Sequence, residues 1–392
     1  MSDQIEPKAR ARFPDLMLAD LLSELLWPGL FRAAALALRP QRLLLAAATI
    51  VLVGIIGSLS RLWSEASFGQ HAGKTLAEAA SGLGIALDSY SFSRFWDLPL
   101  ARLWQAIEAL VLHAPVQIVR AFPVSAFVLG LPMLGVALLG WLAIARSAAF
   151  EFGLHAVEPW SACVARGIER LPGLALSVFA VPIAVMMLAG LTAGLSWVLL
   201  GLPGVNIVGA VLWGLSLFAC VFAALLLAAW ALGLPLLAPA VACDGPDAFD
   251  AMQRALAYVI GRPLRFVIYA AVLMAIGAVS AGLVSLILRG GDELATRSAS
   301  ALLSAEQARI FVPGGAQRSA LEGTDALAAG IIDFWRSLLA LAGGAFVFSF
   351  FSSASSVLYL LMRKLNDGQD IGDLASEIDT VGLSSAEQGR PD

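Results

Sequence analysis

The chain has 392 residues, of which 59% are hydrophobic and 14% are charged, and its net charge is −4. Soluble domains carry about 25% charged residues, so this composition excludes an ordinary water-soluble protein. The weakly acidic balance gives no general attraction to nucleic acid. The three cysteines are far apart and odd in number, so they predict no disulfide framework.

The N-terminal residues 1–27 are predicted to be a cytoplasmic amphipathic segment that precedes a transmembrane domain over 28–362. Asp3 and Glu6 stand where a signal peptide carries positive charge. A cleavable signal peptide is therefore not expected.

Six apolar runs are long enough to cross a bilayer, which needs about 18 or more residues. No Asp, Glu, Lys, Arg or His occurs between Leu171 and Cys243. The runs cover residues 43–62, 123–145, 173–199, 207–231, 264–288 and 335–362. The sequence therefore predicts an all-α polytopic membrane protein with six transmembrane helices.

One phrase occurs three times: a proline, a short basic amphipathic stretch, a second proline and then a long apolar run. A proline suits the first turn of a helix, because its missing N–H would have no partner there. Each copy predicts an interfacial elbow helix, a break and the start of a span, which gives three elbow-helix-plus-hairpin units. The copies run from Pro28 to Pro40, from Pro159 to Pro172 and from Pro246 to Pro263.

Two long loops, 63–122 and 289–333, are predicted on the outer side of the membrane. In the first, apolar residues recur at helical spacing over 100–111. This helix either lies on the outer leaflet or packs on the mouth of the bundle. The second loop is interpreted as a helical excursion with turns at Gly290-Gly291 and Gly314-Gly315.

Lysine and arginine residues decide the orientation, because positively charged loops stay in the cytoplasm. Fifteen of the 25 basic residues fall on the side that holds both termini, which leaves 10 on the other side. Both termini are therefore predicted to be cytoplasmic. Residues 363–392 are acidic and rich in glycine and serine, and they are predicted to form a disordered tail.

The basic residues of the three proline phrases are the strongest functional candidates, because they would form a collar at the inner leaflet. Near the surface each such charge contributes about 1 kcal/mol of attraction to anionic lipid. The alternative is that they are ordinary anchors that follow the positive-inside rule. The predicted headgroup-binding residues are Arg39, Arg42, Arg166, Arg170, Arg262 and Arg265.

Small residues crowd the last span and predict a helix-packing seam, because they let helix backbones approach closely. The alternative is a polar seam that binds a lipid headgroup or a small solute. The seam residues are Gly343, Gly344, Ser349, Ser352, Ser353 and Ser356.

No ionisable residue lies at the centre of a predicted span, which argues against proton-driven transport and against catalysis within the membrane. Glu151 and His155 share one helical face, yet no second pair with ligand spacing accompanies them, so a structural role is favoured over a metal site. Asp244 to Asp247 is interpreted as a turn and a helix cap rather than a cation site. No enzyme activity, metal or cofactor is predicted.

Two passages carry a family resemblance: LLAPAVACDGPDAFDAMQRALAYVIGRPLRFVIY and the later FFSSASSVLYLLMRKLNDG. They resemble a broad group of bacterial multi-span proteins that are similar to the membrane domain attached to some glycerophosphodiester phosphodiesterases. The catalytic barrel of those enzymes, with its paired Glu and His residues, is absent here, so no catalytic residue is carried over. The resemblance implies a membrane body located in the bacterial cytoplasmic membrane.

These features together predict a non-enzymatic integral membrane protein that acts as a lipid-interacting scaffold or as a subunit of a membrane complex. The predicted partners are membrane lipids and proteins of such a complex, and no nucleic acid. The alternative is a permease-like transporter subunit that works with a separate cytoplasmic partner.

Overall fold

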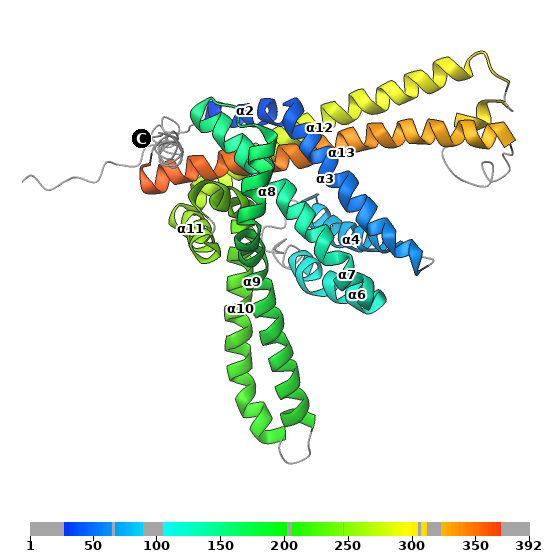
Figure 1. Cartoon of the computed structure of the whole chain (residues 1–392). Coiled ribbons are helices and arrows are strands. Elements are labelled where there is room, and N and C mark those ends of the chain that lie inside the picture. The colour runs from blue at the N-terminus through cyan, green and yellow to red at the C-terminus, as the bar shows by residue number, and fades with distance from the viewer. Residues whose placement is uncertain are drawn as a thin grey trace, which may run out of the picture.

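The computed structural model describes residues 27–64, 67–88, 105–201, 206–245, 247–304, 307–311 and 323–369 (Figure 1). These residues form helices and short connections, and no strand occurs among them, which confirms the predicted all-α class. The predicted N-terminal segment and tail fall almost wholly on residues 1–26 and 370–392, outside the described residues. In chain order the elements are α2 (Trp27–Ala37), α3 (Pro40–Ser58), η1 (Leu59–Leu62), α4 (Phe68–Asp88), η3 (Ala109–His113), α6 (Ala114–Ala121), α7 (Pro123–Val128), α8 (Gly130–Leu154), α9 (Trp160–Gly201), α10 (Asn206–Asp244), α11 (Ala248–Gly261), α12 (Pro263–Ser300), η4 (Gln307–Phe311) and α13 (Gly323–Asp367).

Six helical stretches in the described residues are long and apolar enough to cross a membrane, and each contains one of the predicted apolar runs. Their surfaces carry large uncovered side chains, among them Met187 at 70% exposed, Phe218 at 78% and Ile287 at 71%. Soluble proteins rarely expose apolar patches of this extent. The chain is therefore a multi-pass membrane protein.

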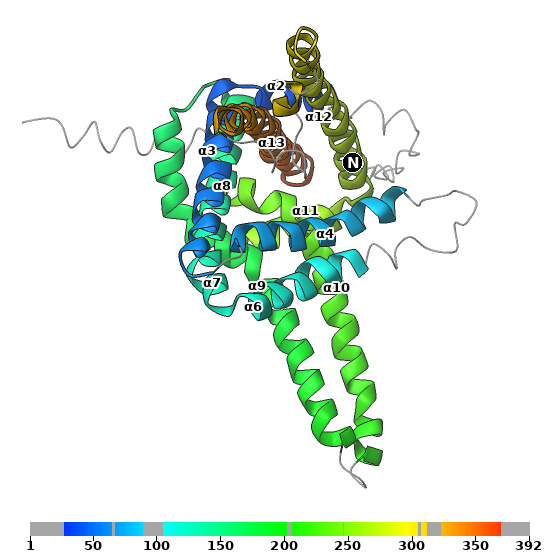
Figure 2. The same cartoon turned by 90° about the vertical axis from the view of Figure 1, so that its right-hand side faces the viewer.

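The long helices converge at one end and diverge at the other. In Figure 1, α9 and α10 form a hairpin that runs downward, while α12 and α13 form a second hairpin that runs to the right. Figure 2, turned by 90°, shows the same separation. The core lies at the convergence, where the C-terminal part of α8, the last turns of α10 and the second half of α13 are buried.

Two of the three proline phrases form an elbow as predicted. Helices α2 and α3 meet at Arg39, whose backbone is extended (φ −62°, ψ 130°). Helices α11 and α12 meet at Arg262, which is also outside the helical region (φ −139°, ψ 66°). Both residues precede a proline, whose ring clashes with a helical conformation of the residue before it. The break in each phrase therefore has a local cause.

The second proline phrase forms no elbow, so that part of the prediction is wrong. Helix α9 is continuous and holds Pro172 in its interior. Arg170, two residues earlier, donates to the backbone carbonyls of Val241 and Ala242 in α10, both at 2.9 Å. These tertiary bonds stabilise the helical conformation just before Pro172, although the proline removes one backbone hydrogen bond. A three-unit repeat is therefore not shown.

The second outer loop also differs from its prediction. Gly290-Gly291 lies within α12 rather than in a turn, and Gly314-Gly315 lies outside the described residues. A helix of 38 residues is about 57 Å long, whereas the hydrocarbon core is about 30 Å thick, so α12 projects beyond it. Arg336 of α13 ties the two helices together there, because it donates to Asp292 and Thr296, both at 2.9 Å.

In the first outer loop, residues 100–104 of the predicted helix lie outside the described residues, and the rest runs into η3 and α6. Val111 and Ala114 are 9% and 2% exposed, and η3 contacts both α4 and α9. Of the two alternatives for this helix, the contacts match packing against the bundle.

The turn and cap predicted around Asp247 are present. The Asp247 carboxylate accepts a hydrogen bond from the backbone N–H of Phe249 at 2.9 Å, at the start of α11. Gly245 adopts a φ of +135°, a backbone conformation that suits glycine. The chain thus turns sharply between α10 and α11.

We expect Asp247→Ala to destabilise α11 by about 1 kcal/mol, because the N–H of Phe249 loses its acceptor. Amide hydrogen exchange in the first turn of α11 should accelerate accordingly. Asp247→Asn keeps an acceptor and should exchange at nearly the original rate. Equal acceleration in both variants would contradict a capping role.

Candidate functional site

The elbow between α2 and α3 places two arginines against one carboxylate of α8. Oε1 of Glu151 accepts from Nε and Nη2 of Arg39 at 2.8 and 2.7 Å. Oε2 of Glu151 accepts from Nη2 of Arg42 at 2.6 Å. Such charge-assisted pairs are among the stronger hydrogen bonds in proteins. Glu151 therefore joins the elbow to α8.

Arg42 lies inside the protein, with a side chain that is 1% exposed. Its guanidinium also donates to Oγ of Ser147 at 3.1 Å, to the Ser147 carbonyl at 2.9 Å and to the Leu36 carbonyl at 2.6 Å. A buried charge is tolerated only when it is paired and its donors are satisfied. Both conditions hold for Arg42.

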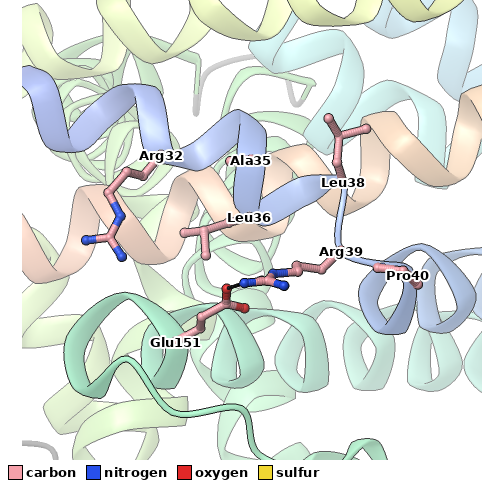
Figure 3. Close-up of a pocket in the computed structure, with 7 residues that line it drawn as sticks. All are labelled: Arg32, Ala35, Leu36, Leu38, Arg39, Pro40 and Glu151. Carbon is pink, nitrogen blue, oxygen red and sulfur yellow. Dashed lines mark hydrogen bonds and ion pairs between the residues drawn. The ribbon is translucent and has the colours of Figure 1, made fainter.

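A cleft of about 450 Å³ opens beside this pair, and Figure 3 shows its lining. The Arg39 guanidinium side chain has 57% of its surface exposed although it contacts Glu151. Arg32 lies on the other wall, over the Phe152 ring at 5.2 Å, with Nη2 3.3 Å from Nδ1 of His155. Apart from Arg32, Arg39 and Glu151, the lining is apolar. The remaining lining residues are Ala35, Leu36, Leu38 and Pro40.

A second group of buried arginines lies at the C-terminal end of α10. Arg146 of α8 forms a two-point pair with Glu158, at 2.9 and 3.2 Å, and donates to the Ala242 carbonyl at 3.2 Å. Arg170 of α9 donates to the same carbonyl. The last carbonyls of a helix have no partner within the helix and carry partial negative charge. The two cations satisfy that end and join α8, α9 and α10.

Asp244, the last residue of α10, accepts contacts from three side chains of α11 and α13. Nη1 of Arg254 in α11 lies 3.0 Å from Asp244, and Nη1 of Arg363 in α13 lies 3.4 Å from it. The Tyr359 hydroxyl also donates to Asp244. These contacts lie in the last turns of α13, which ends at Asp367. The tail predicted to be disordered from residue 363 is therefore helical over its first five residues.

Tyr258 of α11 adds a further link to α13, because its hydroxyl donates to the Asp367 carboxylate. Burial of the phenol and the nearby Asp367 charge raise the pKa of Tyr258. The hydroxyl is therefore protonated at neutral pH and available as a donor. Together with the Asp244 group, this bond fixes the end of α13 against α10 and α11.

The predicted small-residue seam lies between helices. All four serines, Ser349, Ser352, Ser353 and Ser356, are 0% exposed. The Ser349 hydroxyl donates to the Ala37 carbonyl of α2 at 2.8 Å, and the Ser356 hydroxyl donates to the Ala145 carbonyl of α8 at 2.9 Å. A Cβ added to Gly343 would lie 3.4 Å from the Leu288 side chain, and one added to Gly344 would lie 3.5 Å from the Ile50 side chain. These hydroxyl bonds join α13 to its neighbours.

The six predicted collar arginines do not form one continuous surface. Arg42 and Arg170 are 1% and 8% exposed and donate to protein oxygens, so they have little surface to offer a lipid phosphate. Arg39 is exposed in the cleft, and Arg262 is exposed at its elbow. Arg166 and Arg265 are half-buried on α9 and α12. The lipid-contact hypothesis is therefore confined to the exposed members of the set.

Sequence reasoning placed Arg32 among the basic residues of the first proline phrase, but it missed Arg146 and Arg363 as site residues and assigned no charge partner to Glu151 or Asp244. One signal was available: acidic residues directly follow the apolar part of a helix at both Glu151 and Asp244. Within the described ranges, His, Cys, Asp and Glu form no group of three or more that could hold a metal ion.

No protein-family model, no curated protein and no solved structure matches this chain. The site is therefore interpreted from its own geometry.

Proposed function

We propose that this chain is a non-enzymatic, lipid-interacting protein of the bacterial cytoplasmic membrane, acting as a scaffold or as a subunit of a larger complex. Its cleft between α2, α3 and α8 binds the phosphate of an anionic lipid headgroup. The supporting observation is the excess of positive charge at this cleft. Arg39 and the buried Arg42 both pair with the Glu151 carboxylate, and Arg32 lines the same cleft, so three positive charges less one negative charge leave an excess of two at or beside it.

The position of the cleft supports the same proposal. It lies at the start of the first span, on the side where the count of basic residues places the cytoplasm. Leu38, which is 54% exposed, lies on its apolar wall. A headgroup phosphate between Arg32 and Arg39 would keep its glycerol and acyl chains beside that wall. Arginine binds phosphate well because its planar guanidinium offers two parallel N–H donors.

Replacing Arg32 and Arg39 together by glutamine should weaken anionic lipid binding about 30-fold, since each charge contributes about 1 kcal/mol near the membrane surface. The measurement is native mass spectrometry of the full chain, purified in mild detergent and titrated with phosphatidylglycerol. Arg297→Gln is the control, because Arg297 is exposed on the outer part of α12 and pairs with Glu293. Equal phosphatidylglycerol binding in the double variant and the control would overturn the proposal.

A permease-like subunit with a cytoplasmic partner is the second candidate, and exposed apolar residues on α11 favour it. Phe249 and Ile260 are 68% and 67% exposed, and α11 lies at the cytoplasmic end of the bundle in the proposed topology. Stoichiometric copurification of a soluble ATPase would support this candidate. Retained anionic lipid without such a partner would support the lipid-binding proposal.

A further inference from the structure

A second cleft, of about 330 Å³, lies between the helical segment η3–α6 and the middle of α9. One wall carries His113, Gln117 and Arg120, which follow each other at intervals of four and three residues and so share one face of the helix. The facing wall carries Met186 and Ala189 of α9. Leu112 and Val116 complete the first wall, so the polar groups of the cleft all lie on the η3–α6 side and the α9 side is apolar.

The polar wall offers donors that the protein itself does not use. Among the described residues, no hydrogen bond or ion pair engages the side chains of His113, Gln117 or Arg120. No carboxylate is among the residues that line the cleft, so the Arg120 charge is uncompensated there. The cleft between α2, α3 and α8, called the inner cleft from here on, differs in this respect, because Glu151 neutralises part of its charge. An anion in this cleft would meet three unused polar side chains, those of Arg120, Gln117 and His113.

The position of this cleft in the chain matches the outer side of the membrane. The η3–α6 segment belongs to the predicted outer loop 63–122, and Arg120 lies three residues before Pro123, where the second predicted span begins. Met186 and Ala189 lie within the apolar part of α9, residues 173–199. The polar groups therefore lie beside the predicted outer end of a span, where the ester and phosphate groups of lipids begin, and the apolar wall belongs to a span.

We propose that this outer cleft binds an anionic phospholipid of the outer leaflet. The phosphate lies against Arg120, with Gln117 and His113 as further donors, and one acyl chain runs along Met186 and Ala189. The feature that identifies a lipid rather than a soluble phosphate is the apolar wall at membrane depth. The site is separate from the inner cleft and does not depend on the function proposed for it.

The test uses the full chain carrying Arg32→Gln and Arg39→Gln, so that the inner cleft does not contribute. Phosphatidylglycerol is titrated and the binding is followed by native mass spectrometry, with phosphatidylcholine and glycerol 3-phosphate as comparison probes. In this background Arg120→Gln should weaken phosphatidylglycerol binding at least tenfold, and Arg120→Lys should retain part of it. Phosphatidylcholine should bind at least tenfold more weakly, and glycerol 3-phosphate should not compete.

Two further variants keep the test decisive. Ala189→Phe fills the apolar wall and should weaken phosphatidylglycerol binding while Arg120 is intact. Arg289→Gln is the matched control, because Arg289 is exposed at the outer end of the apolar part of α12 and outside the cleft; its binding should not change. Unchanged binding in Arg120→Gln would overturn the site. Glycerol 3-phosphate competition that Ala189→Phe leaves intact would overturn the lipid assignment in favour of a soluble phosphate.

Discussion

Glu151→Gln should lower the free energy of unfolding by about 3–5 kcal/mol, the range expected when one partner of a buried ion pair is removed. Glutamine has nearly the same shape as glutamate but cannot neutralise Arg42, whose side chain is 1% exposed. The bonds from Arg42 to the carbonyls of Ser147 and Leu36 do not involve Glu151 and should persist in the variant. The loss therefore reports the missing negative charge rather than a change in packing.

The measurement is equilibrium unfolding of the full chain in detergent micelles with increasing dodecyl sulfate. Glu78→Gln is the control, since Glu78 and Lys74 form an exposed pair at 3.9 Å on α4; exposed pairs contribute at most about 1 kcal/mol. Arg42→Met combined with Glu151→Leu removes both buried charges and should recover most of the lost stability. A loss in Glu151→Gln no larger than in the control would contradict the role given to the pair.

The six spans were predictable because bilayer thickness sets a minimum apolar length that each run exceeds. The helix ends were not. Beyond residue 288 the apolar pattern stops, but α12 continues because charged residues can extend a helix into water. Arg297 and Glu293, one turn apart at 2.7 Å, are such a pair. An apolar run locates the part of a helix in lipid and gives no information about where the helix ends.

The three proline phrases show where local sequence stops being decisive. Pro40, Pro172 and Pro263 follow similar basic stretches, and the helix breaks at the first and third only. A residue before proline is biased away from the helical region, but the bias is modest. At Pro172 the bonds from Arg170 to the end of α10 outweigh it. Those bonds join residues far apart in the chain, so no reading of the phrase itself reveals them.

The candidate site could be predicted only in part, because it too depends on contacts between residues far apart in the chain. An arginine at the end of a span is equally consistent with contact to lipid phosphate and with contact to a buried carboxylate. Arg39 and Arg42 lie three residues apart, yet the first is exposed in the cleft and the second is buried against Glu151. The pairing with α8 decides between these outcomes, and that pairing is a property of the fold.

Gly57→Ala should destabilise the protein by about 1–3 kcal/mol, the usual cost of overpacking a tight contact. Helices α3 and α4 cross at two glycines, and a Cβ added to Gly57 would lie 2.8 Å from the Cα of Gly69. Both clashing positions belong to backbone, so no side-chain rotation relieves the contact. Alanine is a better helix former than glycine by up to about 1 kcal/mol. The clash must therefore cost more than that gain for Gly57→Ala to lower the free energy of unfolding.

Gly54→Ala is the matched control, because Gly54 lies one turn earlier in α3 and a Cβ there meets nothing within 4 Å. It should be neutral or slightly stabilising, since it gains helix propensity without a clash. The two variants share the same helix, the same chemistry and the same change in hydrophobicity, so their difference in unfolding free energy isolates the α3–α4 contact. If Gly57→Ala proved as stable as Gly54→Ala, the close approach of the two backbones would not contribute to stability, and α4 would be held against α3 by its side chains alone.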